Sequence, residues 1–490
     1  MHTSVAARQR QIRGFVVAWL GITLLMGAVT FIGIYYATGL VGDQNNGSSD
    51  DVSVAALSNA EADDLEQAAP EETVDLGQID TTPVPTAGGD QPAAVAAVPE
   101  VQAEAAALAA PDGQGGAAEA QFATPVPSPT PVPVDNNAFQ LGIQVQMNAD
   151  PEVYRIWMGE VRDKLKLNWI KQQVRWENIE PQPGQYDWGG LDVTFDLAAE
   201  YGIKVMVSVL TTPEWAREPG APLSKVGPPA DAQVFAEFLT TLLRRYPDQI
   251  HAVEVWNEMN IDREWGSVRG LSAADYVRML TAARDAIKAV DPGIIVISGA
   301  LSPTGVNDGV GAYDDFVYMD MLIQAGVLDI ADCIGVHHNG YNIGPNVPWN
   351  NVPNDPTARF RGPFDNPHHS WSFYSTLNGY AQKIQQAGSD KKLCITEFGW
   401  ASTEGLGGTP RSFEFADDNT LAEQAQFFGE AIELMQDWGF VWLAFIWNLN
   451  YGAQSGWDPT NDNVPYALLR PEWHPAPAYE VIAGFNFRGE

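Results

Sequence analysis

The chain has 490 residues, 45% of them hydrophobic and 16 of them Trp, which is enough for one large core and additional segments. Its formal net charge of −35 would repel phosphate groups and therefore argues against a nucleic-acid partner. With only Cys333 and Cys394, the chain is not a disulfide scaffold. We expect both cysteines to be buried free thiols, because nothing in the sequence brings their Cα atoms within the ~7 Å that a disulfide needs.

An apolar segment near the N-terminus predicts a membrane anchor. Residues 14–41 contain no charged side chain, and this run exceeds the ~20 residues that a spanning helix needs. The segment is preceded by Arg8, Arg10 and Arg13 and followed by acidic residues. The positive-inside rule therefore predicts residues 1–13 in the cytoplasm and the rest of the chain outside. A cleaved signal peptide is the alternative, although its apolar core would be shorter, about 7–15 residues.

Residues 42–137 have the composition of a disordered linker. Ala, Pro, Gly, Asp and Glu dominate, and aromatic residues are almost absent. Such a segment cannot bury enough apolar surface to offset the entropy of ordering it. Its last part, residues 124–133, alternates Pro with Thr, Val and Ser and predicts an extended polyproline spacer. We expect a stalk that holds a folded domain away from the membrane.

From residue 138 to 490, apolar runs of strand length alternate with amphipathic helical stretches. The expected strands are Phe139–Val145, Trp169–Val174, Lys204–Leu210, His251–Trp256, Ile294–Ser298, Cys333–Val336, Lys392–Thr396 and Trp442–Ile446. Clear helical patterns between them are Ala232–Tyr246, Ala273–Val290 and Leu421–Trp438. Eight such repeats predict an α/β fold, the (β/α)8 TIM barrel. A doubly wound sheet is the alternative, but no Gly-rich phosphate loop follows any of the strands.

Polar residues follow several of the expected strands. In a (β/α)8 barrel, catalytic groups lie where the strands end at the C-terminal face. Two of these groups are carboxylates, Glu258 after the fourth strand and Glu397 after the seventh. Facing carboxylates can divide one reaction between an acid and a nucleophile, which is the chemistry of glycoside cleavage. Further polar or aromatic residues at the strand ends are Arg175, Asn257, His337, His338, Trp447 and Asn448.

Two motifs resemble the signatures of glycoside hydrolase clan A. They are Trp256-Asn257-Glu258 at the fourth strand and Thr396-Glu397-Phe398-Gly399 at the seventh. The segments 175–181 and 184–188 fit the same pattern, as do Gly335-Val336-His337 and Trp447. The resemblance extends over residues 139–487. Within the clan, the sequence pattern is most similar to families 39 and 5.

This resemblance implies a retaining enzyme on a (β/α)8 barrel. By analogy Glu258 is the acid/base, Glu397 is the nucleophile, and Asn257 contacts the sugar 2-hydroxyl. The expected substrate-binding residues are Asn257, Arg175, His337, Tyr341, Trp400 and Trp447. Similar enzymes often have His-Pro-Tyr at the sixth strand. Here the sequence is His337-His338-Asn339, with Tyr341 two residues later, so the tyrosine that would bond the nucleophile is not assigned.

Several of these residues also have structural interpretations. Glu254 would lie about 13 Å deeper than Glu258 at strand rise, so we expect it to be a structural carboxylate. Arg175 could hold Glu397 ionised, but it could equally pair with a structural carboxylate. We expect no metal, because the pairs His337-His338 and His368-His369 lack helical ligand spacing.

The sequence therefore predicts a membrane-anchored glycoside hydrolase with an extracytoplasmic, monomeric catalytic domain. Its partners would be a poly- or oligosaccharide substrate and the membrane, with water as second substrate and no cofactor. A non-catalytic barrel that binds polysaccharide is one alternative, because it would share the aromatic residues but would not need both glutamates. A transglycosylase is the other alternative.

Overall fold

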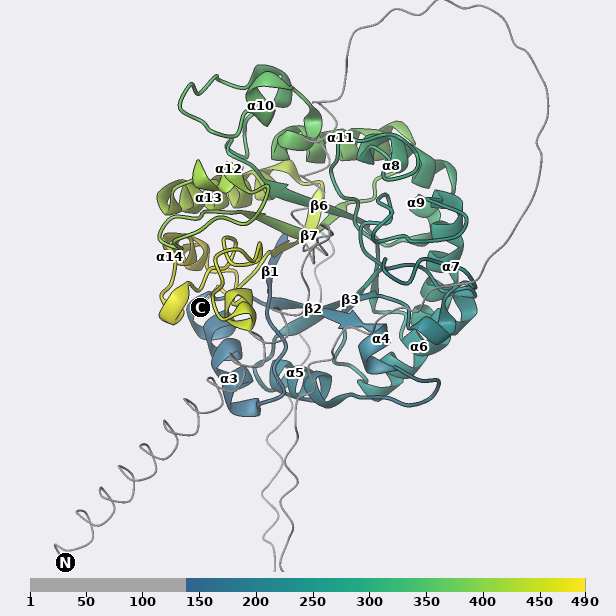
Figure 1. Ribbon diagram of the computed structural model, residues 1–490. Helices are drawn as coiled ribbons and strands as arrows, with labels where there is room; N and C mark the ends of the chain where they lie inside the picture. Colours follow the sequence, from purple (N-terminus) through teal and green to yellow (C-terminus); the bar gives the residue numbers. More distant parts are fainter. Residues whose placement is uncertain (1–137, 490) are drawn as a thin grey trace, which may run out of the picture. The chain divides into compact units, whose positions relative to one another are not determined.

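The computed structural model describes residues 138–489 (Figure 1). The predicted anchor at 14–41 and the linker at 42–137 lie outside these residues. Within the described part of the chain, no helix is long and apolar enough to cross a membrane.

Eight parallel strands form one sheet, as the sequence predicts. They are β1 (Gln140–Gln144), β2 (Trp169–Arg175), β3 (Lys204–Leu210), β4 (Ala252–Val255), β5 (Ile295–Ser298), β6 (Ile334–Gly340), β7 (Leu393–Trp400) and β8 (Val441–Ile446). The hydrogen-bonded order is β5-β4-β3-β2-β1-β8-β7-β6. Parallel bridges from Ile297 to Cys333 and from Leu301 to Val336 join the two edges and close the barrel.

The seam between β5 and β6 depends on a close backbone approach. Ser298 donates its N–H to the carbonyl of Cys333, and its hydroxyl accepts from the N–H of Gly335. A Cβ at position 335 would lie 1.9 Å from the Ser298 carbonyl oxygen, so only glycine fits there.

Helices surround the strands (Figure 1). They are α3 (Pro151–Gly159), α4 (Trp176–Ile179), α5 (Gly189–Glu200), α6 (Ala232–Arg245), α7 (Ala273–Val290), α8 (Asp315–Gln324), α9 (Val327–Ile330), α10 (Gly362–Asp365), α11 (Phe373–Gln386), α12 (Glu414–Asp417), α13 (Leu421–Trp438) and α14 (Pro477–Gly484). Side-chain caps begin several of them. Ser272 accepts from the N–H of Asp275 in α7, and Thr420 forms a capping box with Glu423 in α13.

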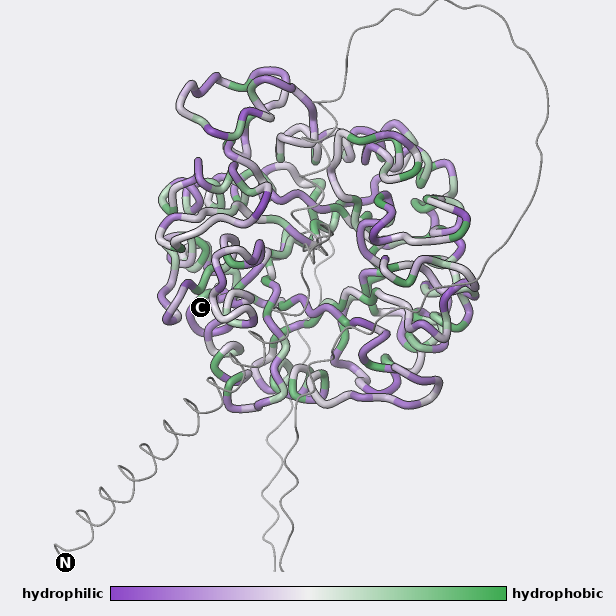
Figure 2. The backbone as a smooth tube through the Cα atoms, in the orientation of Figure 1, coloured by the Kyte–Doolittle hydropathy of each residue, from purple (hydrophilic) through white to green (hydrophobic). Residues whose placement is uncertain are grey.

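Side chains alternate between the two faces of each strand, so the barrel has one apolar layer outside the strands and one inside them. Most buried residues pack between the strands and the helices, and Figure 2 shows hydrophobic stretches along the strands. A second cluster fills the interior of the barrel below the strand ends, with Trp169, Trp442 and Phe445 as its largest members. The barrel is therefore a packed core, and a cavity can form only above this layer.

The expectation of free thiols is wrong. Cys333 and Cys394 form a disulfide in the interior cluster, with Cα atoms 5.9 Å apart. The pairing of β6 with β7 explains this, because the register places Cys394 opposite Gly335, next to the start of β6. Both side chains point into the barrel, so the alternation that buries them also brings them together.

Candidate active site

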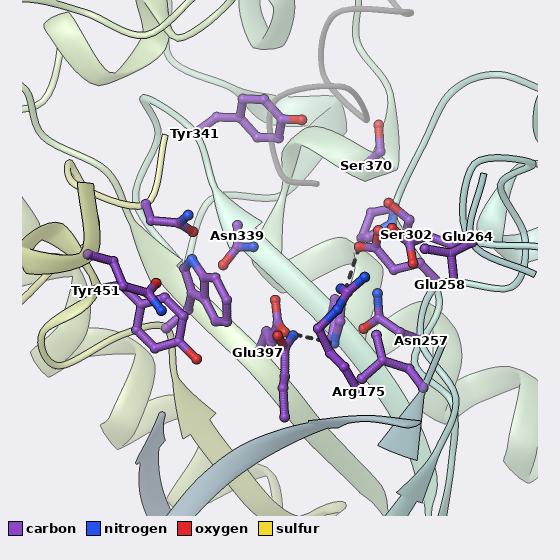
Figure 3. Close-up of a pocket in the computed structure, with 18 residues that line it drawn as sticks. Arg175, Asn257, Glu258, Glu264, Ser302, Asn339, Tyr341, Ser370, Glu397 and Tyr451 are labelled. Carbon is purple, nitrogen blue, oxygen red and sulfur yellow. Dashed lines mark hydrogen bonds and ion pairs between the residues drawn. The ribbon is translucent and has the colours of Figure 1, made fainter. Parts of the chain in front are cut away.

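A cavity of about 260 Å³ opens at the C-terminal ends of the strands (Figure 3). The sequence-predicted residues that line it are Arg175, Asn257, Glu258, His337, Tyr341, Glu397 and Trp447. The other lining residues are Gln173, Leu210, Val226, Glu264, Ser302, Pro303, Asn339, Ser370, Tyr451, Gln454 and Asn463. The two glutamates of the strand-end motifs therefore face one cavity.

A β-bulge directs Glu397 into this cavity. The pairing of β6 with β7 shifts register, so that Val336 lies opposite Ile395 and His337 lies opposite Glu397. The bulge interrupts the two-residue alternation of the strand, and both Thr396 and Glu397 point inward. Thr396 donates a hydrogen bond of 2.5 Å to Glu254, and Glu397 accepts one from Lys171.

Lys171 is the cationic partner of Glu397. Its Nζ lies 2.7 Å from Glu397 Oε1 and 3.9 Å from Glu254 Oε2, and its side chain is fully buried. Glu254 lies below the cavity and also accepts from Ser208 and Thr396. A buried lysine between two carboxylates compensates part of their charge where water cannot. Lys171 and Glu254 thus form a buried polar layer directly beneath Glu397.

Glu258 follows β4 in a strained backbone segment. Trp256 and Glu258 have φ angles of 79° and 38°, in the left-handed region that side chains other than Gly rarely adopt. The Trp256 indole donates a 2.9 Å hydrogen bond to the carbonyl of Glu264, which fixes the turn. The turn directs the Glu258 carboxylate toward His337 Nδ1 and Arg263, each at 3.2 Å.

His337 connects the two glutamates. Its Nδ1 lies 3.2 Å from Glu258 Oε1, and its Nε2 lies 4.0 Å from Glu397 Oε1. Burial alone would lower the pKa of His337, but the two carboxylates outweigh burial and raise it. Burial alone would raise the pKa of Glu258, but His337 and Arg263 outweigh burial and lower it. The proton of this pair therefore resides on His337, and the pKa of Glu258 is not raised as an acid catalyst would require.

One residue of the sequence prediction contacts another carboxylate than Glu397, and one does not line the cavity. The side chain of Arg175 lines the cavity and donates two hydrogen bonds to Glu177. Of the two partners that the sequence left open for Arg175, Glu397 is instead bonded by Lys171. Trp400 is completely buried and packs on Phe373 and Phe428. The expected substrate contact of Trp400 is therefore wrong, because its side chain lies on the helix-facing side of β7.

The other predicted residues do line the cavity. Trp447 lies beside Tyr451, with ring centroids 5.2 Å apart, and the Lys171 ammonium is 5.9 Å from its ring. Tyr341 also lines the cavity and packs against Phe360 and Trp371. Tyr451, whose hydroxyl accepts from Gln144 at 2.6 Å, is a cavity tyrosine that the sequence reasoning missed.

Lys171, Arg263 and Glu264 were also missed. Lys171 could have been found, because Lys171, Gln173 and Arg175 occupy every second position of β2 and therefore share one face, although Gln172 between them is polar too. Arg263 and Glu264 lie in the loop after β4, where no periodic pattern applies. Burial raises the pKa of Glu264 to about 7, and the nearby charge of Glu258 acts in the same direction.

The histidine pairs do not form one centre. His337 lines the cavity, whereas His338 lies on the opposite face of β6 against Phe373. His368 and His369 lie in the loop between β6 and α11, where they approach Asp314.

Comparison with known proteins gives a match to a family model and many structural matches. The family model of glycosyl hydrolase 42, described as beta-galactosidase, matches residues 157–220. A family 39 glycoside hydrolase from Bacteroides cellulosilyticus WH2 has a TM-score of 0.50 and 18% identity, over 72% of this chain and 64% of that one. This chain thus spans less than two thirds of the length of that enzyme.

Two further structures have lower scores. A monomeric beta-xylosidase from Caulobacter crescentus CB15 has a TM-score of 0.46 and 18% identity, over 73% of this chain and 69% of that one. Xylanase 10B from Thermotoga petrophila RKU-1, in complex with xylobiose, has a TM-score of 0.47 and 16% identity, over 72% of this chain and 95% of that one. The likeness to the family 39 structure shows the fold, the parallel eight-stranded barrel that the sequence predicts.

Proposed function

We propose that this chain is a retaining O-glycoside hydrolase that cleaves a poly- or oligosaccharide by double displacement. One observation carries the proposal: Glu258 and Glu397 line the same cavity and lie on either side of His337. A retaining mechanism needs two carboxyl groups that reach opposite sides of one glycosidic bond, about 5–5.5 Å apart. The resemblance to clan A and the family-model match support the same chemistry.

In the first step Glu397 attacks the anomeric carbon, and the bond to the leaving oxygen breaks. Lys171 keeps Glu397 in place for attack through its 2.7 Å hydrogen bond. The leaving oxygen takes a proton from the Glu258 carboxyl group. As Glu397 bonds to the anomeric carbon it loses its negative charge, which removes part of the attraction that keeps the proton on His337. The proton therefore passes from His337 through Glu258 to the leaving oxygen within this step, and Glu258 enters the second step as a carboxylate.

In the second step the Glu258 carboxylate takes a proton from water. The water oxygen attacks the anomeric carbon, and the Glu397 carboxylate leaves, so the product keeps the configuration of the substrate. Asn257, Trp447 and Tyr451 would contact the sugar from the cavity wall. Aromatic faces suit sugar rings, because the C–H faces of the rings are apolar.

We further propose that the enzyme acts outside the cytoplasm on a membrane anchor formed by residues 14–41. The arginines before this segment support this orientation. The Cys333–Cys394 disulfide supports it independently, because disulfides persist mainly in oxidising compartments. After a high-salt wash the protein should remain in the membrane fraction, since salt does not weaken lipid burial. A mature N-terminus near Gly39 would instead indicate a cleaved signal peptide.

Two variants test the division of roles. Glu397→Ala should abolish the covalent glycosyl-enzyme, which mass spectrometry with an activated fluorosugar would detect in the wild type. Glu258→Ala should still form this intermediate from an aryl glycoside with a good leaving group, and azide should release it. Natural linkages should then be cut very slowly. Glu214→Ala, a change of an exposed carboxylate in the loop after β3, is the matched control.

A panel of plant and bacterial polysaccharides separates the alternatives. Hydrolysis of the natural polysaccharide by Glu258→Ala at the wild-type rate would contradict the acid/base role. A non-catalytic binding barrel would be favoured if the wild type cut nothing while all variants still bound polysaccharide. Products longer than the substrate would indicate a transglycosylase.

A further inference from the structure

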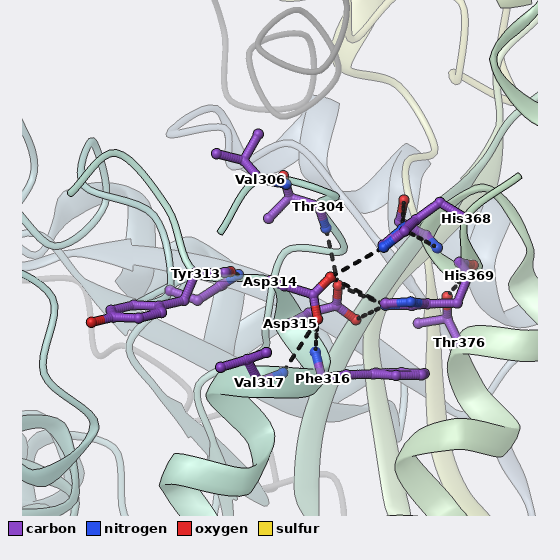
Figure 4. Close-up of polar contacts among 12 residues, drawn as sticks. Thr304, Val306, Tyr313, Asp314, Asp315, Phe316, Val317, His368, His369 and Thr376 are labelled. Carbon is purple, nitrogen blue, oxygen red and sulfur yellow. Dashed lines mark hydrogen bonds and ion pairs between the residues drawn. The ribbon is translucent and has the colours of Figure 1, made fainter. Parts of the chain in front are cut away.

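A second polar cluster lies outside the cavity, between the loop that follows β5 and the loop that follows β6. It consists of Asp314, His368 and His369 (Figure 4). Asp314 Oδ2 is 3.4 Å from His368 Nε2 and 3.8 Å from His369 Nε2. One ligand atom from each of the three residues lies within 4.8 Å of the others.

The backbone fixes Asp314 with one oxygen directed at the histidines. Asp314 is the N-cap of α8, and its Oδ1 accepts from the N–H groups of Phe316 and Val317. This leaves Oδ2, the atom that faces both imidazoles. The capping role makes the carboxylate rigid without occupying its second oxygen.

A stacked ring and a buried carboxylate fix the orientation of the His369 side chain. Its ring stacks on Phe316 with centroids 3.6 Å apart, and its Nε2 lies 3.1 Å from Asp315 Oδ1. Asp315 is fully buried and accepts from the Tyr380 hydroxyl at 2.5 Å and from the Thr304 N–H. Asp315 therefore fixes the orientation of the His369 ring, and a cation at Nε2 would take the place of this hydrogen bond.

The spacing of the cluster fits a tetrahedral ion. Zinc binds imidazole nitrogen and carboxylate oxygen at about 2.0–2.2 Å, so neighbouring ligand atoms of a tetrahedron lie about 3.4 Å apart. The pair Asp314–His368 already has this separation, His369 Nε2 lies 3.8 Å from Asp314, and the three ligand atoms all lie within 4.8 Å of one another. Two imidazoles with one carboxylate favour zinc and similar transition metals over Mg²⁺ or Ca²⁺, which prefer oxygen ligands.

We propose that Asp314, His368 and His369 bind one zinc-class divalent cation that clamps the loop after β5 to the loop after β6. Both loops form the wall of the catalytic cavity: Ser302 and Pro303 come from the first, and Ser370 directly follows the two histidines in the second. The cation would therefore hold two parts of the cavity wall together. This site is independent of the proposed glycosidase chemistry, because none of its ligands lines the cavity.

Zinc titration of the full-length chain tests the site. After removal of metal with EDTA, isothermal titration calorimetry with Zn²⁺ should show one site per chain, and Zn²⁺ should raise the melting temperature by several degrees. Mg²⁺ should do neither. Asp314→Asn and His368→Ala should each weaken Zn²⁺ binding at least tenfold and abolish the thermal shift. The Asn variant is especially informative, because Asn preserves the helix cap and removes only the anionic ligand.

Two controls keep the test interpretable. His474→Ala removes an exposed histidine far along the chain and should bind Zn²⁺ as the wild type does. His368→Cys supplies another zinc ligand and should restore binding. Circular dichroism and melting of the metal-free variants should match the metal-free wild type. Failure of the wild type to bind at 100-micromolar Zn²⁺ would overturn the proposal, and so would unchanged binding by both ligand variants.

Discussion

Lys171 donates a 2.7 Å hydrogen bond to Glu397 from a side chain that has no exposed surface. This pair joins the floor of the barrel to the proposed nucleophile. Because Glu397 faces the cavity while Lys171 lies beneath it, the lysine can orient the carboxylate without occupying the substrate space.

Lys171→Met should therefore impair catalysis more than substrate binding. Methionine keeps most of the volume but removes the charge and the donor, so Glu397 loses the contact that positions it. We expect kcat to fall by about 10²–10³ with little change in KM, because this is the size of the loss of one well-placed electrostatic contact. Lys204→Met, a change of a strand lysine at the other end of the barrel, is the control. Equal rates for both variants, measured with an aryl glycoside, would contradict the positioning role.

His337→Gln should change the pH dependence of the reaction. In the free wild type the proton of the Glu258–His337 pair is lost with the raised pKa of His337, above its ordinary value of 6.5. In the variant only the Glu258 carboxyl group can hold this proton. The basic limb of the kcat/KM profile should then move to lower pH. An unmoved basic limb, with His474→Gln as reference, would show that His337 does not share the proton.

Trp447 and Trp400 should respond differently to truncation. Trp447→Ala removes an aromatic face from the cavity wall and should raise KM while changing stability modestly. Trp400→Ala leaves a void in the core and should lower the free energy of unfolding by about 3–5 kcal/mol. Denaturant unfolding and steady-state kinetics on both variants measure the contrast. A Trp400→Ala protein that is stable but fails to bind substrate would contradict the core assignment.

Removal of the disulfide should destabilise the folded chain. Cys333 and Cys394 are separated by 61 positions, and closing a loop of this length restricts the unfolded chain by about 4 kcal/mol in the chain-entropy model. The variant Cys333→Ala/Cys394→Ala should therefore melt several degrees lower than the oxidised wild type. Peptide mapping without reductant should recover the two cysteines in one cross-linked product. Recovery of two free thiols from freshly isolated protein would contradict the disulfide.

Stability should fall in acid partly because of His251. Its Nδ1 accepts from the N–H of Val205, and burial together with Lys204 lowers its pKa from 6.5 to about 4. Between these two values the unfolded chain binds a proton that the folded chain does not, so stability is lost as pH falls from 6.5 to about 4. The shift corresponds to a loss on the order of 1–3 kcal/mol.

His251→Gln should make the profile of melting temperature against pH flatter in this window. Glutamine can still accept a hydrogen bond but does not titrate. His474→Gln, at an exposed position, should leave the slope of the wild type unchanged. A slope that is equal in all three proteins would rule out a contribution of His251.

The sequence by itself determined the barrel and the two glutamates. Apolar runs of strand length such as Lys204–Leu210 and helical patterns such as Ala273–Val290 were found at the expected positions, because hydrophobicity and helical periodicity are local properties of the sequence. The C-terminal ends of parallel strands share one rim, so Glu258 and Glu397 could be assigned to one site without coordinates.

Only the tertiary structure decided which groups meet. The strand register pairs Cys333 with Cys394 and Lys171 with Glu397, and the bulge at Thr396 turns two successive side chains inward. The tertiary structure also places Trp400 on the helix-facing side of β7 and Trp447 in the cavity wall. The physical reason is that local periodicity tells which face a side chain occupies. Its partners depend on register, bulges and loop paths, which are set by packing across the whole barrel.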